Sequence, residues 1–269
     1  MAPTPERYAQ RGNRAFESLL ATRSASSDAA FLLPYLREGM RLLDVGCGPG
    51  SITLDLAQAV APGDVVAVDS QPEAVEQGST AAAARGVENV RFETADAYAL
   101  PFAPGSFDCV FANGLLMHLS EPRRAVAEMR RVLRPGGIVG IRDPDFGGFL
   151  FAPATELLAR WFAVRVEVRR HHGCDPFLSR RYRSLLLEAG FIDTQGSASI
   201  NVAGSTEATQ RYARFLEAQL RGYAATVLAQ RWMDEACLDA VVTELDSWAS
   251  KPDAFVAGVW CSALGWKPA

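Results

Sequence analysis

Short apolar runs alternate with amphipathic helical patterns over residues 40–143, and this alternation constrains the fold more than any other feature of the sequence. It is typical of repeated strand–helix units, which build a mostly parallel sheet. Helices are predicted at 51–60, 72–85 and 121–133, and right-handed crossovers would place helices on both faces of the sheet. The predicted strands of this region are 41–46, 65–69, 90–94, 107–112 and 137–142.

The rest of the chain has mainly helical periodicity. Helical patterns cover 153–172, 180–189 and a long block at 206–250, and a further helix is predicted near 6–21. Two late strands are predicted at 191–202 and 254–266, and they would pair in space with the block at 206–250 inserted between them. The sequence therefore predicts an α/β core with helical additions.

The composition predicts a folded protein without a membrane segment. Apolar residues make up 49% and charged residues 22% of the 269 positions, which argues against long disorder. The first thirty residues carry several charges and lack the apolar segment of a signal peptide. No stretch approaches the roughly 20 apolar residues that a spanning helix needs. We therefore expect a cytoplasmic protein that makes no membrane contact.

The cysteine pattern and the net charge narrow the class of ligand. The five cysteines are scattered, with no C-x-x-C pair and no histidine at ligand spacing, so neither a disulfide framework nor a metal site is expected. A net charge of −4 gives no general attraction to nucleic acid. The expected partner is therefore a small molecule, and the formation of a homo-oligomer stays open.

A glycine-rich stretch, LLDVGCGPGS, follows the first predicted strand at residues 42–51. Glycines at positions 46, 48 and 50 allow the backbone to approach a ligand closely, because no Cβ intervenes, and the following helix begins with free N–H groups. A dinucleotide fingerprint needs glycine where Ser51 stands, and no G-K-[S/T] follows as in a phosphate-binding loop. A dehydrogenase is therefore disfavoured, and the loop is expected to hold another cofactor.

Polar side chains follow the next three predicted strands. Asp69 ends the second strand, Asp96 follows the third and Asn113 follows the fourth. The carboxyl ends of parallel strands meet at one edge of the sheet, so these groups should converge on one crevice. A carboxylate in the position of Asp69 can accept hydrogen bonds from both hydroxyls of a ribose, which indicates a cofactor that contains a nucleoside.

Taken together, these motifs resemble those of the class I S-adenosylmethionine-dependent methyltransferases, in the branch that includes ubiquinone/menaquinone-type and many small-molecule enzymes. The resemblance covers residues 36–145, with weaker similarity at 180–191 and 252–255. The motifs that carry it are the loop 44–50, Asp69, Asp96-Ala97 with Leu100-Pro101-Phe102, the strand at 107–110, and Arg131-Val132-Leu133-Arg134-Pro135-Gly136-Gly137.

The resemblance implies a Rossmann-like, doubly wound α/β fold. Its seven-stranded sheet would be mostly parallel, with an antiparallel last strand, and a helical cap would cover the crevice. The domain divisions that follow are an N-terminal cap segment at 1–35, a cofactor-binding core at 36–145, helical cap insertions at 146–179 and 206–250, and the remaining core at 180–205 and 251–269.

The resemblance also implies how S-adenosylmethionine would be held. The loop would line the methionine part of the cofactor, with Asp44 fixing the loop and favouring the cationic end. Asp69 would hold the ribose, Asp96 and the backbone N–H of Ala97 would bind the adenine, and Asn113 would lie near the methionine moiety. The full set of implied cofactor residues is Asp44, Gly46, Cys47, Gly48, Asp69, Ser70, Asp96, Ala97 and Asn113.

Candidates for a general base are few, because the chain has three histidines. His118, Asp143 and His171 are the candidates. Each also has a structural interpretation: His118 stands where the family often carries a histidine whatever its substrate, Asp143 suits a turn cap, and His171 suits a helix C-terminus. A base is optional for methyl transfer, which depends first on proximity and orientation.

Arginines gather on one face of the helix predicted at 153–172. Arg165, Arg169 and His172 share that face, and further arginines follow. They suit an acidic substrate such as a carboxylate or phosphate, but a solvated surface is the favoured interpretation.

The predicted function is methyl transfer from S-adenosylmethionine to a small apolar or aromatic metabolite by in-line displacement, with a role in secondary metabolism as one option. Two alternatives stay open. One is a cofactor-binding protein that is catalytically silent or regulatory, and the other is a methyltransferase for a protein or tRNA.

Overall fold

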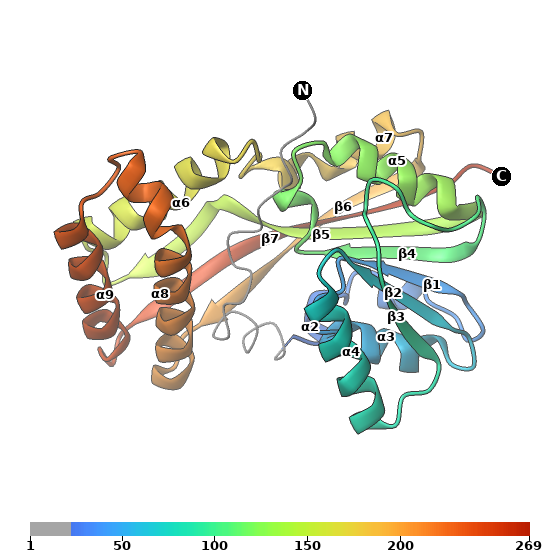
Figure 1. Cartoon of the computed structure of the whole chain (residues 1–269), viewed down its shortest axis with the longest axis horizontal. Helices are drawn as coiled ribbons and strands as arrows, with labels where there is room; N and C mark the ends of the chain where they lie inside the picture. Colours follow the sequence, from blue (N-terminus) through green and yellow to red (C-terminus); the bar gives the residue numbers. More distant parts are fainter. Residues whose placement is uncertain (1–22) are drawn as a thin grey trace.

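The computed structural model describes residues 23–269, and a seven-stranded sheet forms its centre (Figure 1). The strand order is β3-β2-β1-β4-β5-β7-β6, and β7 runs antiparallel to both of its neighbours. The predicted fold class is therefore confirmed. The strands are β1 (Leu42–Val45), β2 (Val65–Asp69), β3 (Val90–Thr94), β4 (Phe107–Asn113), β5 (Leu133–Ala152), β6 (Ile192–Ala203) and β7 (Phe255–Trp266).

Helices cover both faces of the sheet because successive strand residues point in opposite directions. Leu42 packs in a cluster with residues of α2 and α3, whereas its neighbour Leu43 packs in a second cluster with residues of α5 and α7. These two clusters form the core on either side of the sheet. Figure 1 shows the helices that cover its two faces. The helices of this part are α2 (Ala25–Asp28), α3 (Ser51–Val60), α4 (Pro72–Arg85), α5 (Pro122–Val132) and α7 (Tyr182–Glu188), with short 3-10 turns η1 (Leu33–Tyr35), η2 (Leu116–His118) and η3 (Leu178–Arg181).

Strand β5 is longer than predicted. The sequence placed its end at residue 142, but β5 shifts register against β7 between Pro144 and Phe149 and then pairs with it as far as Ala152. Proline removes a ladder donor and normally argues against a central strand, and here the irregularity accommodates it. As a result, Asp143 and Asp145 lie within β5 rather than after it.

The extended ends of β5, β6 and β7 reach beyond the core toward three further helices (Figure 1). These are α6 (Glu156–His171), α8 (Thr206–Ala229) and α9 (Glu235–Ala249), so the block predicted at 206–250 consists of two helices. They share a third hydrophobic cluster, in which Trp161 and Trp248 are fully buried. The Trp248 indole donates to the carbonyl of Ala152 at 2.8 Å, which ties this cluster to the end of β5.

Two further expectations concern segments outside the core. The helix predicted near 6–21 lies outside the described residues. Among residues 23–269, no helix combines the length and the apolar character that crossing a membrane requires.

Candidate functional site

The glycine loop after β1 adopts a backbone that other residues reach only with strain. Gly46, Gly48 and Gly50 have φ angles of +76°, +54° and +80°. A Cβ on Gly46 would lie 3.0 Å from Leu115 Cδ1, and one on Gly50 would lie 2.7 Å from the ring of Phe92. The loop is therefore pressed against neighbouring side chains, and glycine is required for both its conformation and its packing.

The loop is fixed to the end of β2 by hydrogen bonds. The N–H of Gly48 donates to Asp69 Oδ2 at 3.0 Å, and the N–H of Gln71 donates to Asp69 Oδ1 at 3.0 Å. Burial raises the pKa of the Asp69 carboxyl, while these backbone donors act against that shift. Each carboxylate oxygen has more than one lone pair, so Asp69 can accept further hydrogen bonds from hydroxyl groups of a ligand.

Asp44 lies beneath the loop, 2% exposed, and accepts a hydrogen bond from Thr53 Oγ1 at 2.6 Å. Burial raises the pKa of Asp44 to about 7, and the charge of Asp69 adds to the shift. A ligand cation near Asp44 would favour the carboxylate form. Burial also raises the pKa of the Cys47 thiol, so Cys47 is not poised as a thiolate nucleophile.

Asn113, at the end of β4, is the clearest sign of a ligand at this edge. It is 8% exposed, and neither Oδ1 nor Nδ2 has a hydrogen-bond partner within the described chain. Buried amides are normally satisfied, so this one is arranged to meet a group with both a donor and an acceptor, as the amino-acid end of S-adenosylmethionine has. The residues present therefore fit this cofactor.

The other predicted cofactor residues lie at the same edge of the sheet. Asp96 and Ala97 follow β3, and Asp96 Oδ1 accepts from the N–H of Tyr98 at 2.8 Å, which fixes the turn. Ser70 directly follows Asp69 and is exposed. Since β3, β2, β1 and β4 are adjacent in the sheet, their carboxyl ends bring all nine predicted residues to one row.

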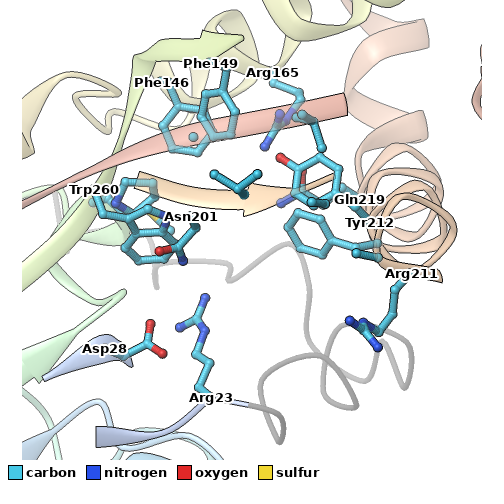
Figure 2. A pocket seen from close by; sticks show the side chains of 18 of the residues that line it. Arg23, Asp28, Phe146, Phe149, Arg165, Asn201, Arg211, Tyr212, Gln219 and Trp260 are labelled. Atoms are coloured by element: carbon cyan, nitrogen blue, oxygen red, sulfur yellow. The ribbon is translucent and has the colours of Figure 1, made fainter. Parts of the chain in front are cut away.

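The structure also contains a cavity of about 430 Å³, and Figure 2 shows residues that line it. Met117 and His118 of η2 line it, and so does Arg23, whose Nη1 would be 3.3 Å from a Cβ on Gly114. Since Gly114 follows Asn113, the cavity adjoins the crevice at the end of β4. Several large aromatic side chains from β5, α8 and β7 line it: Phe146, Phe149, Tyr212, Phe215, Tyr223 and Trp260.

The arginines of α6 are not a solvated face, which corrects the favoured prediction. Arg165 and Arg169 line the cavity and are 2% and 4% exposed. The Arg165 guanidinium lies 5.0 to 5.2 Å from the ring centres of Phe146, Phe149 and Phe162. The next arginine along the helix, Arg170, is exposed as predicted. The positive charge of α6 is therefore directed partly into the cavity.

The three candidate bases occupy different places. His118 lines the cavity, and burial together with the charges of Arg169 and Arg23 lowers its pKa to about 3. Asp143 is 1% exposed and accepts a hydrogen bond from the Tyr182 hydroxyl; it is not among the residues that line the cavity. His171 is exposed at the end of α6, with its ring edge-on to Trp232.

Sequence reasoning missed a buried ion pair beside the cavity, of which Asp28 lines the cavity. Arg142 of β5 is 1% exposed, and its Nη1 lies 2.8 Å from Asp28 Oδ1, while its guanidinium lies 4.4 Å from the ring centre of Trp260. An arginine inside a predicted central strand was the available signal. Gln219 was also missed: it is 3% exposed on the buried side of α8, and its Oε1 has no hydrogen-bond partner in residues 23–269.

Comparison with known proteins gives one family and relatives that cover much of the chain. Residues 36–175 match the family model described as "Methyltransferase domain". A probable methyltransferase of Aspergillus luteorubrus, ltbC, is 28% identical over 265 residues, which cover 91% of this chain and 92% of that protein. An uncharacterised 37.1 kDa protein in transposon TN4556 of Streptomyces fradiae is 33% identical over 234 residues, covering 81% of this chain but 64% of that protein.

A solved structure shares the fold. Phosphoethanolamine N-methyltransferase 2 of Haemonchus contortus, in complex with phosphomonomethylethanolamine and S-adenosylhomocysteine, superposes with a TM-score of 0.59 at 21% identity. The match covers 97% of this chain and 58% of that protein.

Proposed function

The chain belongs to the class I S-adenosylmethionine-dependent methyltransferases, and we propose that it methylates a small apolar or aromatic molecule bound in the cavity beside its cofactor crevice. The observation that carries the proposal is the cavity itself. It adjoins the edge of the sheet where the cofactor residues lie, and six large aromatic side chains line it. A volume of about 430 Å³ suits a small molecule rather than a folded partner.

We assign the cofactor to the row of residues at the strand ends. Asp69 binds the ribose hydroxyls, and the loop from Gly46 to Gly48 lies along the methionine part together with Asn113. Asp44 favours the cationic end, and Ser70, Asp96 and Ala97 lie along the adenine. When bound, S-adenosylmethionine supplies an electrophilic methyl group on a positively charged sulfur.

The remaining task of the protein is to hold the acceptor and to exclude water. Aromatic side chains from β5, α8 and β7 enclose the acceptor on several sides, and we assign α6, α8 and α9 to a cap that positions it. Fixing two reactants in an aligned geometry can lower a barrier by roughly 7–11 kcal/mol in favourable cases. Little further chemistry is needed from the side chains if the acceptor atom is already nucleophilic.

His118 is the candidate base that lines the cavity. Because its pKa is about 3, the imidazole is neutral near neutral pH and accepts a hydrogen bond, but it is a weak base. We therefore assign His118 to orienting the acceptor. Asp143 and His171 do not line the cavity, and we assign them no direct contact with the acceptor.

The test is a turnover screen that measures S-adenosylhomocysteine formation. The panel contains apolar and aromatic phenols, amines, carboxylic acids and enolisable carbon acids, with a tRNA pool and a protein mixture as separate arms. We expect turnover in the small-molecule arms. Tight binding of S-adenosylmethionine without any turnover would favour the silent or regulatory alternative, and turnover confined to tRNA or protein would overturn the small-molecule assignment.

A pair of variants tests whether the cavity holds the acceptor. Ala208 lines the cavity on α8, whereas Ala225 on the same helix is exposed. Ala208→Phe should abolish most small-molecule turnover, because its ring occupies the cavity, while leaving S-adenosylmethionine affinity unchanged. Ala225→Phe should leave both quantities at the wild-type level. Equal turnover in all three proteins would place the acceptor elsewhere.

A further inference from the structure

Arg165 is a buried cation without a carboxylate partner in the described part of the chain. Its side chain projects from α6 into the cavity, the residue is 2% exposed, and neither Nε nor Nη1 has a hydrogen-bond partner there. Removing a guanidinium from water is strongly unfavourable unless its N–H donors form hydrogen bonds and its charge is paired. A buried arginine left in this state indicates a partner that arrives from outside the protein.

The aromatic rings around Arg165 do not replace that partner. The ring centres of Phe146, Phe149 and Phe162 lie 5.0 to 5.2 Å from the guanidinium, and such contacts attract a cation to the face of the ring. Cation–π contacts compensate part of the lost hydration, but they satisfy none of the N–H donors. The rings also hold the guanidinium in place, so it is preorganised for a ligand.

The charges of the cavity wall also favour an anionic ligand. Among residues 23–269, four arginines line the cavity, and the single carboxylate that lines it is Asp28. Asp28 is already paired with the buried Arg142, and Arg211, at the exposed side, is paired with Glu207 at 3.0 Å. The protein has a net charge of −4, yet this cavity is positive, and a concave wall of one sign concentrates the opposite charge inside it.

Two more polar groups stand at the same end of the cavity as Arg165 (Figure 2). Tyr212 lines the cavity, and the charge of Arg165 acts against the rise that burial causes in the pKa of the Tyr212 hydroxyl, so the two groups are neighbours. Gln219 Oε1 is buried and unpartnered within residues 23–269, which leaves an acceptor for a ligand donor. Asp28 and Arg23 lie at the opposite end (Figure 2).

We infer that the acceptor molecule carries an oxyanion, a carboxylate or phosphate, which Arg165 binds at the cap end of the cavity while the apolar body of the molecule lies among the aromatic rings. Gln219 accepts a hydrogen bond from a donor group of the same molecule. The oxyanion is an anchor rather than the methylated group. This inference rests on the proposed function for the role of the cavity, but the binding preference itself does not require turnover.

Matched probes test the inference by calorimetry in the presence of saturating S-adenosylhomocysteine. The probes are 2-naphthoate, 2-naphthyl phosphate and the neutral 2-naphthamide, which share one ring system. We expect at least one anion to bind about tenfold or more tightly than the amide, since hydrogen bonds to a charged group contribute roughly 1.5–3 kcal/mol. The stronger anion identifies carboxylate or phosphate. Equal binding of all three probes by the wild-type protein overturns the inference.

Variants of single arginines test which residue causes the preference for an anionic probe. Arg165→Met keeps much of the apolar stem and removes the charge, so it should bring the ratio of anion to amide affinity close to one. Arg165→Lys should keep part of the preference, and Arg170→Met, at an exposed arginine of α6 that pairs with Glu167 and does not line the cavity, should keep all of it. A preference that persists in Arg165→Met, or disappears in Arg170→Met, contradicts the assignment. If Arg165→Met fails to fold, the affinities of the three probes for the wild-type protein still test the inferred anion preference.

The outcomes separate this inference from the proposed function. Anion preference without turnover of any small molecule would leave the binding inference standing and remove the proposed function. Turnover of neutral acceptors, with no anion preference in the wild-type protein, would support the proposed function and overturn the binding inference.

Discussion

The backbone N–H of Gly48 donates a hydrogen bond to Asp69 Oδ2 at 3.0 Å. The glycine loop after β1 and the acid after β2, which are 21 residues apart in the sequence, are therefore one unit before any ligand binds. Asp69 has two roles as a result: it fixes the loop, and it offers its remaining lone pairs to a ribose.

Replacing Asp69 tests this double role. Asp69→Ala should weaken S-adenosylhomocysteine binding about 10- to 100-fold, because hydrogen bonds to a charged group contribute roughly 1.5–3 kcal/mol. Calorimetry measures the affinity. Asp64→Ala is the matched control, since Asp64 precedes β2 at its other end and pairs with Arg41 near the surface. Full affinity in Asp69→Ala would show that the ribose binds elsewhere.

Cofactor affinity should depend on pH through Asp44. Its pKa is raised to about 7 by burial, and the cationic amino group of the cofactor favours the carboxylate form. Affinity should therefore rise with pH, by up to about tenfold per pH unit below pH 7, and level off above it. Calorimetry across this range, with S-adenosylhomocysteine as the ligand, gives the profile.

Two variants assign that pH dependence to a residue. Asp44→Asn should bind more weakly and show a flatter profile. Asp143 also has a pKa raised to about 7, but its hydrogen-bond partner is Tyr182 and it is not among the groups that shift the pKa of Asp44, so Asp143→Asn should retain the wild-type profile. A slope that survives in Asp44→Asn but is lost in Asp143→Asn would reverse the assignment.

A pair of glycine variants separates backbone strain from close packing. Gly50 and Gly86 both have left-handed backbones, with φ of +80° and +64°, but only at Gly50 does an added Cβ meet a neighbour, the ring of Phe92 at 2.7 Å. Gly86→Ala should lower the free energy of unfolding by about 1–2 kcal/mol. Gly50→Ala should lower it further and also weaken cofactor binding. Equal losses in urea denaturation would mean that the packing at Gly50 is unimportant.

Much of the core is predictable because its signals are local. The stop of α4 at Gly86 and the loop glycines after β1 each mark an element end within a few residues, and the predicted strand at 65–69 coincides with β2. The convergence of the polar residues follows from parallel topology alone. The extension of β5 past Pro144 is different, since it depends on pairing with β7, more than a hundred residues away.

The burial of Arg165 and Arg169 shows a second limit. The helical period of a sequence predicts which residues share one face of a helix, but it does not predict whether that face packs in the core, lines a cavity or contacts solvent. Trp161 and Val164 pack in the cluster with α8 and α9, while the arginine face of the same helix meets a cavity enclosed by β5, α8 and β7. Only the arrangement of these distant segments distinguishes an enclosed positive surface from a solvated one.

The pKa of His118 has a consequence for stability that can be measured. The folded protein holds it at about 3, whereas an unfolded histidine titrates near 6.5. Below pH 6.5 the His118 imidazole is therefore protonated in the unfolded chain but stays neutral in the folded protein. The free energy of unfolding falls as a result when the pH is lowered toward 3. At about pH 5 this loss is on the order of 2 kcal/mol relative to neutral pH.

Comparison with His118→Asn isolates this effect. Between about pH 7.5 and pH 5, the wild-type protein should lose about 2 kcal/mol more of its unfolding free energy than the variant does. Asp44 and Asp143, whose pKa values are raised, act in the opposite direction over this range, but they do so in both proteins and cancel in the difference. His171→Asn, at the exposed end of α6, serves as the control and should follow the wild-type protein. Parallel pH profiles for the wild-type protein and His118→Asn in urea denaturation would show that burial and the charges of Arg169 and Arg23 do not lower the pKa of His118.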